Sequence, residues 1–379
     1  MKVVIVAPVH AYDDVRVFRK EAVTLAAAGH EVVLYARTPD GQPLERDGVS
    51  VRPVRYRNRL SRFAQLPLVG HRAWREDADV YHLHNPDTIP IAAGLKARRR
   101  RVVYDTHEDF RTEILLRGWL PTPARRPAAA VVTAMESFVA RIADAVIVTQ
   151  EQLLDRLPGA VLIGNPPIVD RAAGLAAADR REARVAADDD SPRVLGYVGG
   201  LSTDRGLLRM VDLVAALQQY RPVRLLLIGG AVNDDALARA QARPGWRHVE
   251  HRGPLPQEEA FAALDEADAG LILFQDTASH RHIDPNKIYE YLALALPFIA
   301  TDFAGWRARF GAAQVGLFVP DSTDVADLAA RVADFLRDRG SLARAGRAGA
   351  DFVWERYSWQ RDGAPLLLAL YDRLASRSG

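Results

Sequence analysis

The sequence predicts an α/β protein made of two similar domains. Short apolar strands alternate with helical segments in two series, over about residues 1–170 and 192–357. Such alternation is typical of parallel sheets in which each crossover is a helix. With 379 residues, of which 49% are apolar and 26% are charged, the chain is long enough for two hydrophobic cores. We therefore expect two doubly wound, Rossmann-like domains.

The first series begins with a strand at residues 2–7, a helix that stops at Gly29, and a second strand at 31–36. The loop after the first strand lacks the glycine-rich fingerprint of dinucleotide sites, which weakens an NAD-binding interpretation. That loop carries polar residues instead, namely His10, Asp13, Asp14 and Arg16. These residues either face a ligand crevice or, for the two aspartates, cap the helix.

Further strands are expected at 49–54, 79–83, 101–105, 144–148 and 160–163. Two of them end in polar clusters, YHLHNPD (81–87) and YDTHEDF (104–110). Because the carboxyl ends of parallel strands meet at one edge of a sheet, we expect these side chains to converge there. The residues concerned are His84, Asn85, Asp87, Asp105, His107 and Glu108.

An alanine-rich, charged stretch at 171–191 is expected to be a linker, because it ends in Asp188, Asp189 and Asp190 before Pro192. Six strands of the second series follow, at 193–200, 223–230, 247–251, 269–274, 297–300 and 315–319. Gly199, Gly200 and Arg205 precede a helix expected at about 206–220. A helix start offers free amides to an anion, and Arg205 adds a guanidinium.

A second anion site is expected at HIDPNKIYEYLALALP, residues 282–297. Asp284 and Pro285 have the properties of a helix cap and first helical residue. Lys287 then lies in the first turn, in a chain with four lysines and 46 arginines. Its ammonium and the helix amides suit a phosphate, although the Asp284 carboxylate could occupy the same place. Arg205 and Lys287 together predict a grip on a diphosphate.

The composition excludes some classes of site. Because the chain has no cysteine, it has no disulfide and no thiolate metal site. No pair of histidines and no spacing of carboxylates predicts a metal site either. We therefore expect no cofactor. Seven arginines and no acidic residue lie between Gly48 and Arg75. This 52–75 arginine cluster is either solvated surface or a peripheral contact with an anionic membrane or acidic acceptor. We expect a cytoplasmic protein, or one at the inner face of the membrane, and nothing predicts nucleic-acid binding.

The motifs resemble, in order, those of family 4 glycosyltransferases with the GT-B architecture. They are HAYDDVRVFRKEAVTLAAAGHEVVLYA, VYHLHNPDTIPI, VVYDTHEDF, GYVGGLSTDRG and PNKIYEYLALALPFIAT, and ERYSWQ (355–360) resembles the point where such chains cross back. The resemblance implies two domains facing a cleft. Residues 1–170, completed by a last helix within 358–379, would bind the acceptor. Residues 192–357 would bind the nucleotide-sugar donor.

The resemblance also implies roles for individual residues. Glu290 would bind the donor ribose, and Arg205 and Lys287 would bind the diphosphate. His107 would approach the donor sugar. We take His107, Arg205 and Lys287 as the catalytic residues. Donor-binding residues would further include Gly199, Gly200, His282, Asp284 and Asn286. Acceptor-binding residues would be Asp14, Arg16, Asn85, Asp105 and Glu108.

Two positions depart from the family pattern. His282 stands where the first glutamate of the Glu, seven residues, Glu motif is expected, and Gly200 where an arginine often follows the turn. The expected activity is a metal-independent, retaining sugar transfer from a nucleotide sugar, with UDP favoured over GDP, to a saccharide, lipid-linked or small-molecule hydroxyl. Front-face substitution is preferred to double displacement. The alternatives are a nucleotide-sugar 2-epimerase of the same fold and a non-catalytic protein that binds sugar nucleotides or polyanions.

Overall fold

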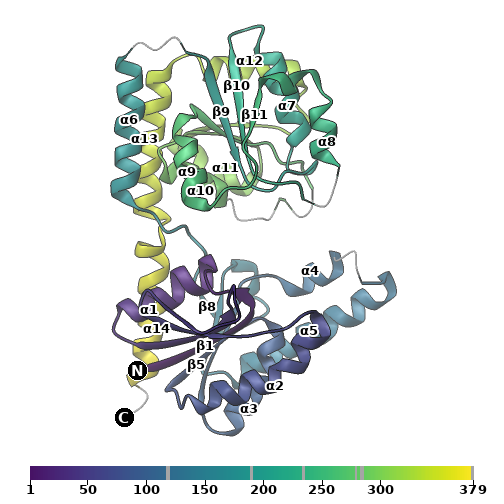
Figure 1. Ribbon diagram of the computed structural model, residues 1–379, viewed down its shortest axis with the longest axis vertical. Helices are drawn as coiled ribbons and strands as arrows, with labels where there is room; N and C mark the ends of the chain where they lie inside the picture. Colours follow the sequence, from purple (N-terminus) through teal and green to yellow (C-terminus); the bar gives the residue numbers. More distant parts are fainter. Residues whose placement is uncertain (117–119, 188–190, 233–234, 278–279, 282–285, 377–379) are drawn as a thin grey trace. The chain divides into compact units, whose positions relative to one another are not determined.

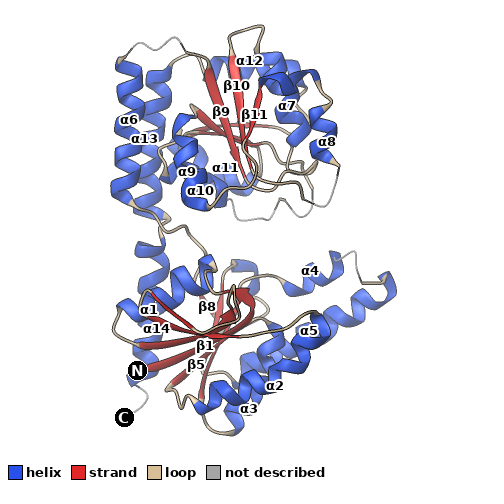
Figure 2. Cartoon of the chain, viewed as in Figure 1, coloured by secondary structure: helices blue, strands red, loops and turns tan. Residues whose placement is uncertain are grey.

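The chain folds as two compact α/β domains. The computed structural model describes residues 1–116, 120–187, 191–232, 235–277, 280–281 and 286–376. The N-terminal domain comprises Met1–Asn165 and Trp359–Gly379, and the C-terminal domain comprises Pro166–Ser358. Each has one sheet flanked by helices (Figure 2). The predicted α/β class with two parallel-sheet domains is confirmed.

The N-terminal sheet has the strand order β3-β4-β2-β1-β5-β6-β7-β8. All neighbours are parallel except the pair β3 and β4, and β3 was not predicted. The strands are β1 (Lys2–Ala11), β2 (Glu31–Arg37), β3 (Leu44–Arg46), β4 (Val49–Pro53), β5 (Val80–His84), β6 (Arg101–Thr106), β7 (Ala145–Val148) and β8 (Val161–Leu162).

Helices cover both faces of this sheet. A π-helical turn, Val15–Ala22, leads into α1 (Val23–Ala27) on one face, where α14 (Ala364–Ser376) also packs. The other face is covered by α2 (Arg59–Arg75), α3 (Ile89–Ala97) and α5 (Thr122–Ile142), and α4 (Phe110–Leu116) packs against α5. In the described residues no helix combines the length and apolar character needed to cross a membrane.

The C-terminal sheet has six parallel strands in the order β11-β10-β9-β12-β13-β14. They are β9 (Arg193–Val198), β10 (Val223–Ile228), β11 (Val249–His251), β12 (Ala269–Ile272), β13 (Phe298–Thr301) and β14 (Gly316–Val319), all within the predicted ranges except at Thr301. Its helices are α6 (Arg171–Ala186), α7 (Leu207–Leu217), α8 (Ala236–Gln241), α9 (Gln257–Ala263), α10 (Asn286–Ala293), α11 (Ala304–Phe310), α12 (Val325–Phe335) and α13 (Arg339–Arg356) (Figure 1).

The strand orders decide where ligands can bind. In the N-terminal sheet, the direction in which successive strands are added to the sheet reverses at β1, which has β2 on one side and β5 on the other. In the C-terminal sheet, β9 lies in the same way between β10 and β12. Open α/β sheets bind ligands outside the carboxyl ends of the strands at such switch points. The predicted site residues of each domain follow these strands or strands on the same side of the switch point.

The last helix belongs to the N-terminal domain, as predicted. The indole Nε1 of Trp359 donates to Thr24 Oγ1 at 2.9 Å, and the hydroxyl of Tyr371 lies 3.0 Å from His82 Nδ1. Leu367, Leu370 and Leu374 are buried in the same core as the first strand. The C-terminal segment therefore completes this domain.

The prediction of a linker at 171–191 was wrong for most of its length. Residues Arg171–Ala186 form α6, which lies beside α13 along its length (Figure 1). Small residues make this close approach feasible, because Ala177 and Ala178 are buried with Ala350 of α13. Asp188–Asp190 lie outside the described residues.

We expect Gly346→Ala to destabilise the C-terminal domain. Helix propensity alone predicts the opposite, since alanine in a helix interior is favoured over glycine by about 1 kcal/mol. A methyl group at Gly346 of α13 would lie 2.0 Å from the carbonyl oxygen of Ala295. Overpacking of this kind costs about 1–3 kcal/mol. Chemical denaturation of the variant measures the sign.

The matched control is Gly305→Ala in α11, where the added methyl group would meet no atom within 4 Å. This variant should be neutral or more stable. Equal stabilisation by both substitutions would contradict the tight packing of α13 against the segment that contains Ala295.

Candidate functional site

The two polar clusters of the N-terminal domain meet at one edge of the sheet. Strands β5 and β6 are parallel neighbours, and His84 pairs with Asp105 in their register. His10, from the end of β1, lies with its ring centroid 5.1 Å from that of His107 and 6.2 Å from that of His84. The predicted convergence of these strand ends is therefore confirmed.

Asp14 performs the capping role that the sequence left open. Its Oδ1 accepts from the amides of Arg16 and Val17 at 2.9 Å each, and its Oδ2 lies 3.0 Å from His10 Nδ1. Burial opposes ionisation, but the contacts with His10 and the amides hold the pKa of Asp14 well below its ordinary value. Asp14 is only partly buried, so the carboxylate also reaches the surface of the edge.

Asn85 is the third member of the group that contains His10 and Asp14. Its Nδ2 lies 3.0 Å from His10 Nε2, so with the ring proton on Nδ1 the histidine donates to Asp14 and accepts from the amide. Asn85 has φ +70°, a conformation that asparagine adopts more readily than most residues. This turn directs the side chain back toward β1.

His107 and Glu108 follow β6 at the same edge. The Nδ1 of His107 lies 3.6 Å from Asp105 Oδ1, and its side chain is 15% exposed. Glu108 is partly buried, and its carbonyl oxygen accepts from Thr106 Oγ1 at 3.4 Å. Because His82 and His84 are fully buried, His107 and His10 are the histidines here that a ligand can touch.

The expectation that Arg16 and Asp105 contact an acceptor directly needs correction. Arg16 is 5% exposed and Asp105 is fully buried. The Nη2 of Arg16 lies 2.7 Å from Asp105 Oδ2 and 2.9 Å from Glu21 Oε1. These residues form a buried ion-pair network beneath the edge, and Asp105 contacts His107 at the surface.

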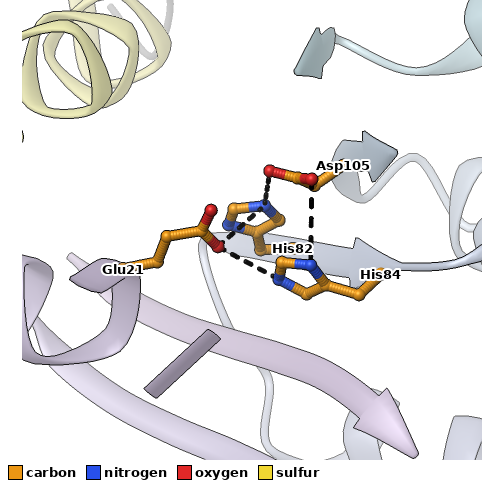
Figure 3. A group of neighbouring side chains, drawn as sticks. All are labelled: Glu21, His82, His84 and Asp105. Carbon is orange, nitrogen blue, oxygen red and sulfur yellow. Dashed lines mark ion pairs between the residues drawn. The ribbon is translucent and has the colours of Figure 1, made fainter. Parts of the chain in front are cut away.

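Sequence reasoning missed Glu21 and His82, which complete this network. Glu21, His82, His84 and Asp105 come from three elements and point toward one another (Figure 3). The His84 Nε2 atom is 3.2 Å from Glu21 Oε2, and the His82 and His84 rings stack at 4.6 Å. The only sequence signal was the spacing of two histidines on one side of β5.

These four residues could present one ligand atom each within 4.8 Å of one another. A divalent ion there would lie beside the Arg16 guanidinium, which already contacts both carboxylates. The two charges would repel at short range in a medium of low dielectric. The donor set therefore suits an internal ion-pair network better than a metal.

The network sets unusual protonation states. Burial raises the pKa of Glu21 from 4.5 to about 7, against the opposing effect of Arg16. Burial also works against ionised Asp105, but Arg16 and the histidines hold its pKa well below the ordinary value. Burial lowers the pKa of His84 to about 3, so this ring is neutral at physiological pH.

The residues predicted to hold a diphosphate lie around the turn after β9 in the C-terminal domain. A methyl group at Gly199 would lie 2.6 Å from Lys287 Nζ, and one at Gly200 would lie 2.9 Å from Arg205 Nη1. The Lys287 ammonium therefore packs against Gly199, and the Arg205 guanidinium packs against Gly200. Gly199 has φ +135°, which glycine adopts without strain. Only a residue without a side chain allows both cations this close to the backbone.

Two tyrosines that sequence reasoning missed hold this arrangement. The hydroxyl of Tyr197 donates to the carbonyl oxygen of Gly200 at 2.9 Å, and its ring lies 5.7 Å from Lys287 Nζ. The hydroxyl of Tyr291 in α10 accepts from Val198 N and donates to Leu271 O, each at 3.3 Å. Tyr291 thus fixes the helix that carries Lys287 to the ends of β9 and β12.

Lys287 is a partly buried cation. Burial lowers its pKa, nearby Glu290 works in the opposite direction, and Arg205 adds to the lowering by repulsion. Asn286, the first residue of α10, is exposed, and Glu290 lies one turn beyond it. His282 and Asp284, together with Pro285, lie outside the described residues.

Comparison with known proteins identifies the family. Residues 15–169 match the model of the glycosyl transferase 4-like domain, and residues 192–338 match that of the glycosyl transferases group 1. The chain belongs to the family 4 glycosyltransferases. This glycosyltransferase is 24% identical over 372 residues to a glycogen synthase of Mycobacterium tuberculosis (strain CDC 1551 / Oshkosh), over 89% of this chain and 85% of the relative.

Solved structures share the GT-B fold. A sucrose-phosphate synthase from Thermosynechococcus elongatus aligns with a TM-score of 0.69 at 20% identity, covering 100% of both chains. The HepE protein of Anabaena, in complex with UDP, aligns with a TM-score of 0.68 at 16% identity, covering 99% of this chain and 100% of its own. These likenesses confirm the predicted architecture, and the family confirms that the protein is an enzyme.

The buried network predicts a pH-dependent stability that Glu21→Gln removes. A carboxyl whose pKa is raised on folding stabilises the fold fully below its unfolded pKa and loses this effect as pH rises through the folded value. For Glu21 that window runs from 4.5 to about 7. The free energy of unfolding of the variant, relative to wild type, should therefore increase across it by up to about 3 kcal/mol.

The measurement is chemical denaturation at pH 4.5 and 7.5, with the N-terminal domain followed by hydrogen exchange. Asp14 and Asp105 are mostly ionised in both states across this window, because it lies above their ordinary pKa of 3.8 and folding lowers that pKa further. Glu151→Gln removes an exposed carboxylate of the same domain and should follow wild type. A pH-independent difference for Glu21→Gln would contradict this assignment.

Proposed function

We propose that the enzyme is a retaining, metal-independent glycosyltransferase that moves a sugar from a UDP-sugar to an acceptor hydroxyl. The observation that carries this proposal is the pair of cations, Lys287 and Arg205, resting on Gly199 and Gly200 at the switch point of the C-terminal sheet. The Anabaena relative has been solved with UDP and with UDP-glucose, and a relative from E. coli with UDP-2-fluoro glucose. These complexes support UDP over GDP.

The diphosphate would bind over the glycine turn. Its charge grows as the bond to the sugar breaks, so fixed cations stabilise the transition state more than the bound substrate. The amino end of α7 has no side-chain cap, so the positive end of its dipole would add to the charge of Arg205. Glu290 would bind the ribose hydroxyls, and Asn286 would lie at the edge of the site.

The acceptor would bind at the edge of the N-terminal sheet. Asp14, Asn85 and Glu108 would hold its hydroxyl groups, with His107 toward the donor sugar. Arg16 and Asp105 would orient His107 from below. We favour front-face substitution, in which a donor phosphate oxygen accepts the proton of the acceptor hydroxyl and the anomeric configuration is retained.

A divalent ion is not required in this scheme, because Arg205 and Lys287 supply positive charge where the diphosphate leaves. In a panel of UDP, GDP, dTDP and ADP, we expect UDP to raise the melting temperature most. A ligand at 100 times its Kd stabilises by about 2.7 kcal/mol. EDTA should change neither this shift nor turnover. A larger shift with GDP, or turnover lost to EDTA and restored by Mg²⁺, would contradict the respective part of the proposal.

Kinetics should separate the roles of the donor residues. Lys287→Ala and Arg205→Ala should each lower kcat by roughly 10- to 100-fold, because each removes a charge-assisted contact that strengthens in the transition state. Glu290→Gln should mainly raise the donor KM, because a ribose contact is similar in both states. Steady-state rates on variants with wild-type melting curves provide the measurement.

The controls lie in the same domain. Arg331→Ala removes an exposed arginine of α12 and should leave both constants unchanged. Gly199→Ala should act like Lys287→Ala, because its methyl group displaces the ammonium. Gly230→Ala, in the neighbouring turn, is the control for this variant, because its methyl group meets no atom within 4 Å. Wild-type kcat/KM in both Lys287→Ala and Arg205→Ala would disprove the grip.

A further inference from the structure

Helix α2 of the N-terminal domain is apolar on two opposite sides. One side, with Leu66, Val69 and Ala73, is buried in the core. On the other side Leu60 is 82% exposed, Phe63 50% and Leu68 42%. These positions recur at helical spacing with Ala64 and Pro67 between them, so they form a continuous stripe. Apolar surface of this kind commonly marks an interaction site.

A groove adjoins the exposed stripe. A cavity of about 480 Å³ lies between α2 and α3, and Phe63 and Pro67 belong to both the stripe and the groove. This volume is in the range of small-ligand sites. Its lining is mostly apolar, with His71 and Arg98 as the ionisable residues: Phe63, Leu66, Pro67, Gly70, His71, Trp74, Pro90, Ile91, Gly94, Leu95 and Arg98.

Around the stripe, Arg62 of α2 pairs with Asp87 at 3.6 Å, but other arginines have no matching carboxylate among the described residues. Arg57, Arg72 and Arg75 are exposed, and no carboxylate in the described part of the chain pairs with them. The acidic residues that follow α2, Glu76 and Asp77, contact Lys2, Arg52 and Arg100 rather than these three arginines. The surface therefore combines exposed hydrocarbon with unpaired positive charge.

This combination decides between two occupants. A second copy of the chain, related by a two-fold axis through the stripe, would place arginines against arginines. An anionic bilayer offers phosphates to the arginines and hydrocarbon to the stripe. We propose that α2 docks this enzyme on an anionic phospholipid membrane, with the stripe in the interface and an acyl chain in the groove.

In this arrangement α2 lies in the plane of the membrane surface. Leu60, Phe63 and Leu68 enter the boundary between headgroups and acyl chains, as amphipathic helices of peripheral proteins do. Arg72 and Arg75 remain at the level of the phosphates. Trp74 lines the groove and its ring lies 5.3 Å from the Arg98 guanidinium, so this side chain reports on groove occupancy.

The test is flotation of the full chain with vesicles of phosphatidylcholine, with or without phosphatidylglycerol. We expect binding to the anionic vesicles, weakened by salt because the Debye length falls from about 10 Å at 0.1 M to about 3 Å at 1 M. Leu60→Ser with Phe63→Ser should weaken binding by roughly tenfold or more. Arg75→Gln should weaken it about fivefold, the contribution of one arginine near an anionic surface.

Matched controls separate this surface from general stickiness. Val131→Ser removes a side chain of α5 that is 59% exposed, and Arg331→Gln removes one charge from the other domain; both should bind as wild type. Vesicles with brominated acyl chains should quench the tryptophan fluorescence of wild type more than that of Trp74→Phe. Sugar transfer to a water-soluble acceptor should be unchanged in Leu60→Ser with Phe63→Ser.

Several results would overturn the proposal. They are equal binding to neutral vesicles, full binding by Leu60→Ser with Phe63→Ser, or equal quenching of wild type and Trp74→Phe. A wild-type dimer that this double variant dissociates would show that a second copy covers the stripe. Loss of transfer to a water-soluble acceptor with binding retained would count against the stripe as a membrane surface. None of these outcomes depends on the donor assignment.

Discussion

The guanidinium of Arg16 holds the N-terminal edge together. It bridges Glu21 on its own helical segment and Asp105 at the end of β6, and its Nη1 donates to Gly164 O at 3.2 Å. Burying charges is costly unless each has close partners, and loss of one partner leaves an uncompensated charge. The positions of the first helix, β6 and the segment after β8 are therefore coupled. Asp105 also lies 3.6 Å from His107 Nδ1, so the network extends to the surface of the edge.

The two candidate sites have opposite electrostatic designs. At the N-terminal edge, positive and negative groups neutralise each other internally, and the surface offers hydrogen-bonding groups to an uncharged ligand such as a sugar. At the C-terminal edge, Lys287 and Arg205 repel one another, and burial already lowers the pKa of the lysine. Glu290 offsets part of this repulsion, and a diphosphate would supply further counter-charge. This difference explains why we assign the donor anion to the second domain.

The sequence predicted those features that depend on local pattern. Apolar runs located the strands, and the rule that parallel strand ends share an edge brought His84 and Asp105 together. The expected helix starts, and not this rule, predicted that Lys287 and Arg205 act together on one diphosphate. Partners that lie far apart in sequence were not visible in this way. Glu21 lies within a helical pattern, and Tyr197 and Tyr291 occupy positions typical of core residues, so only tertiary contacts show what their polar atoms bind.

The error at 171–191 has a similar cause. The stretch is rich in alanine and charge, which fits a linker as well as a helix packed through small residues. The helix α6 is stabilised by α13, whose residues lie more than 150 positions later in the chain, as the pairing of Arg347 with Glu182 shows. Local composition contains no sign of that partner.

The use of lysine in this chain supports the donor assignment by a separate route. Where arginine is the usual cation, the few lysines stand at sites that suit a compact ammonium: Lys2 is shared by Glu31 and Glu76, and Lys96 binds Asp144. Lys287 differs because it rests on Gly199 and faces the Tyr197 ring. A planar guanidinium needs a wider space and would meet the turn that the ammonium fits. The lysine is thus matched to a narrow position beside the glycine turn, where we propose that a phosphate binds.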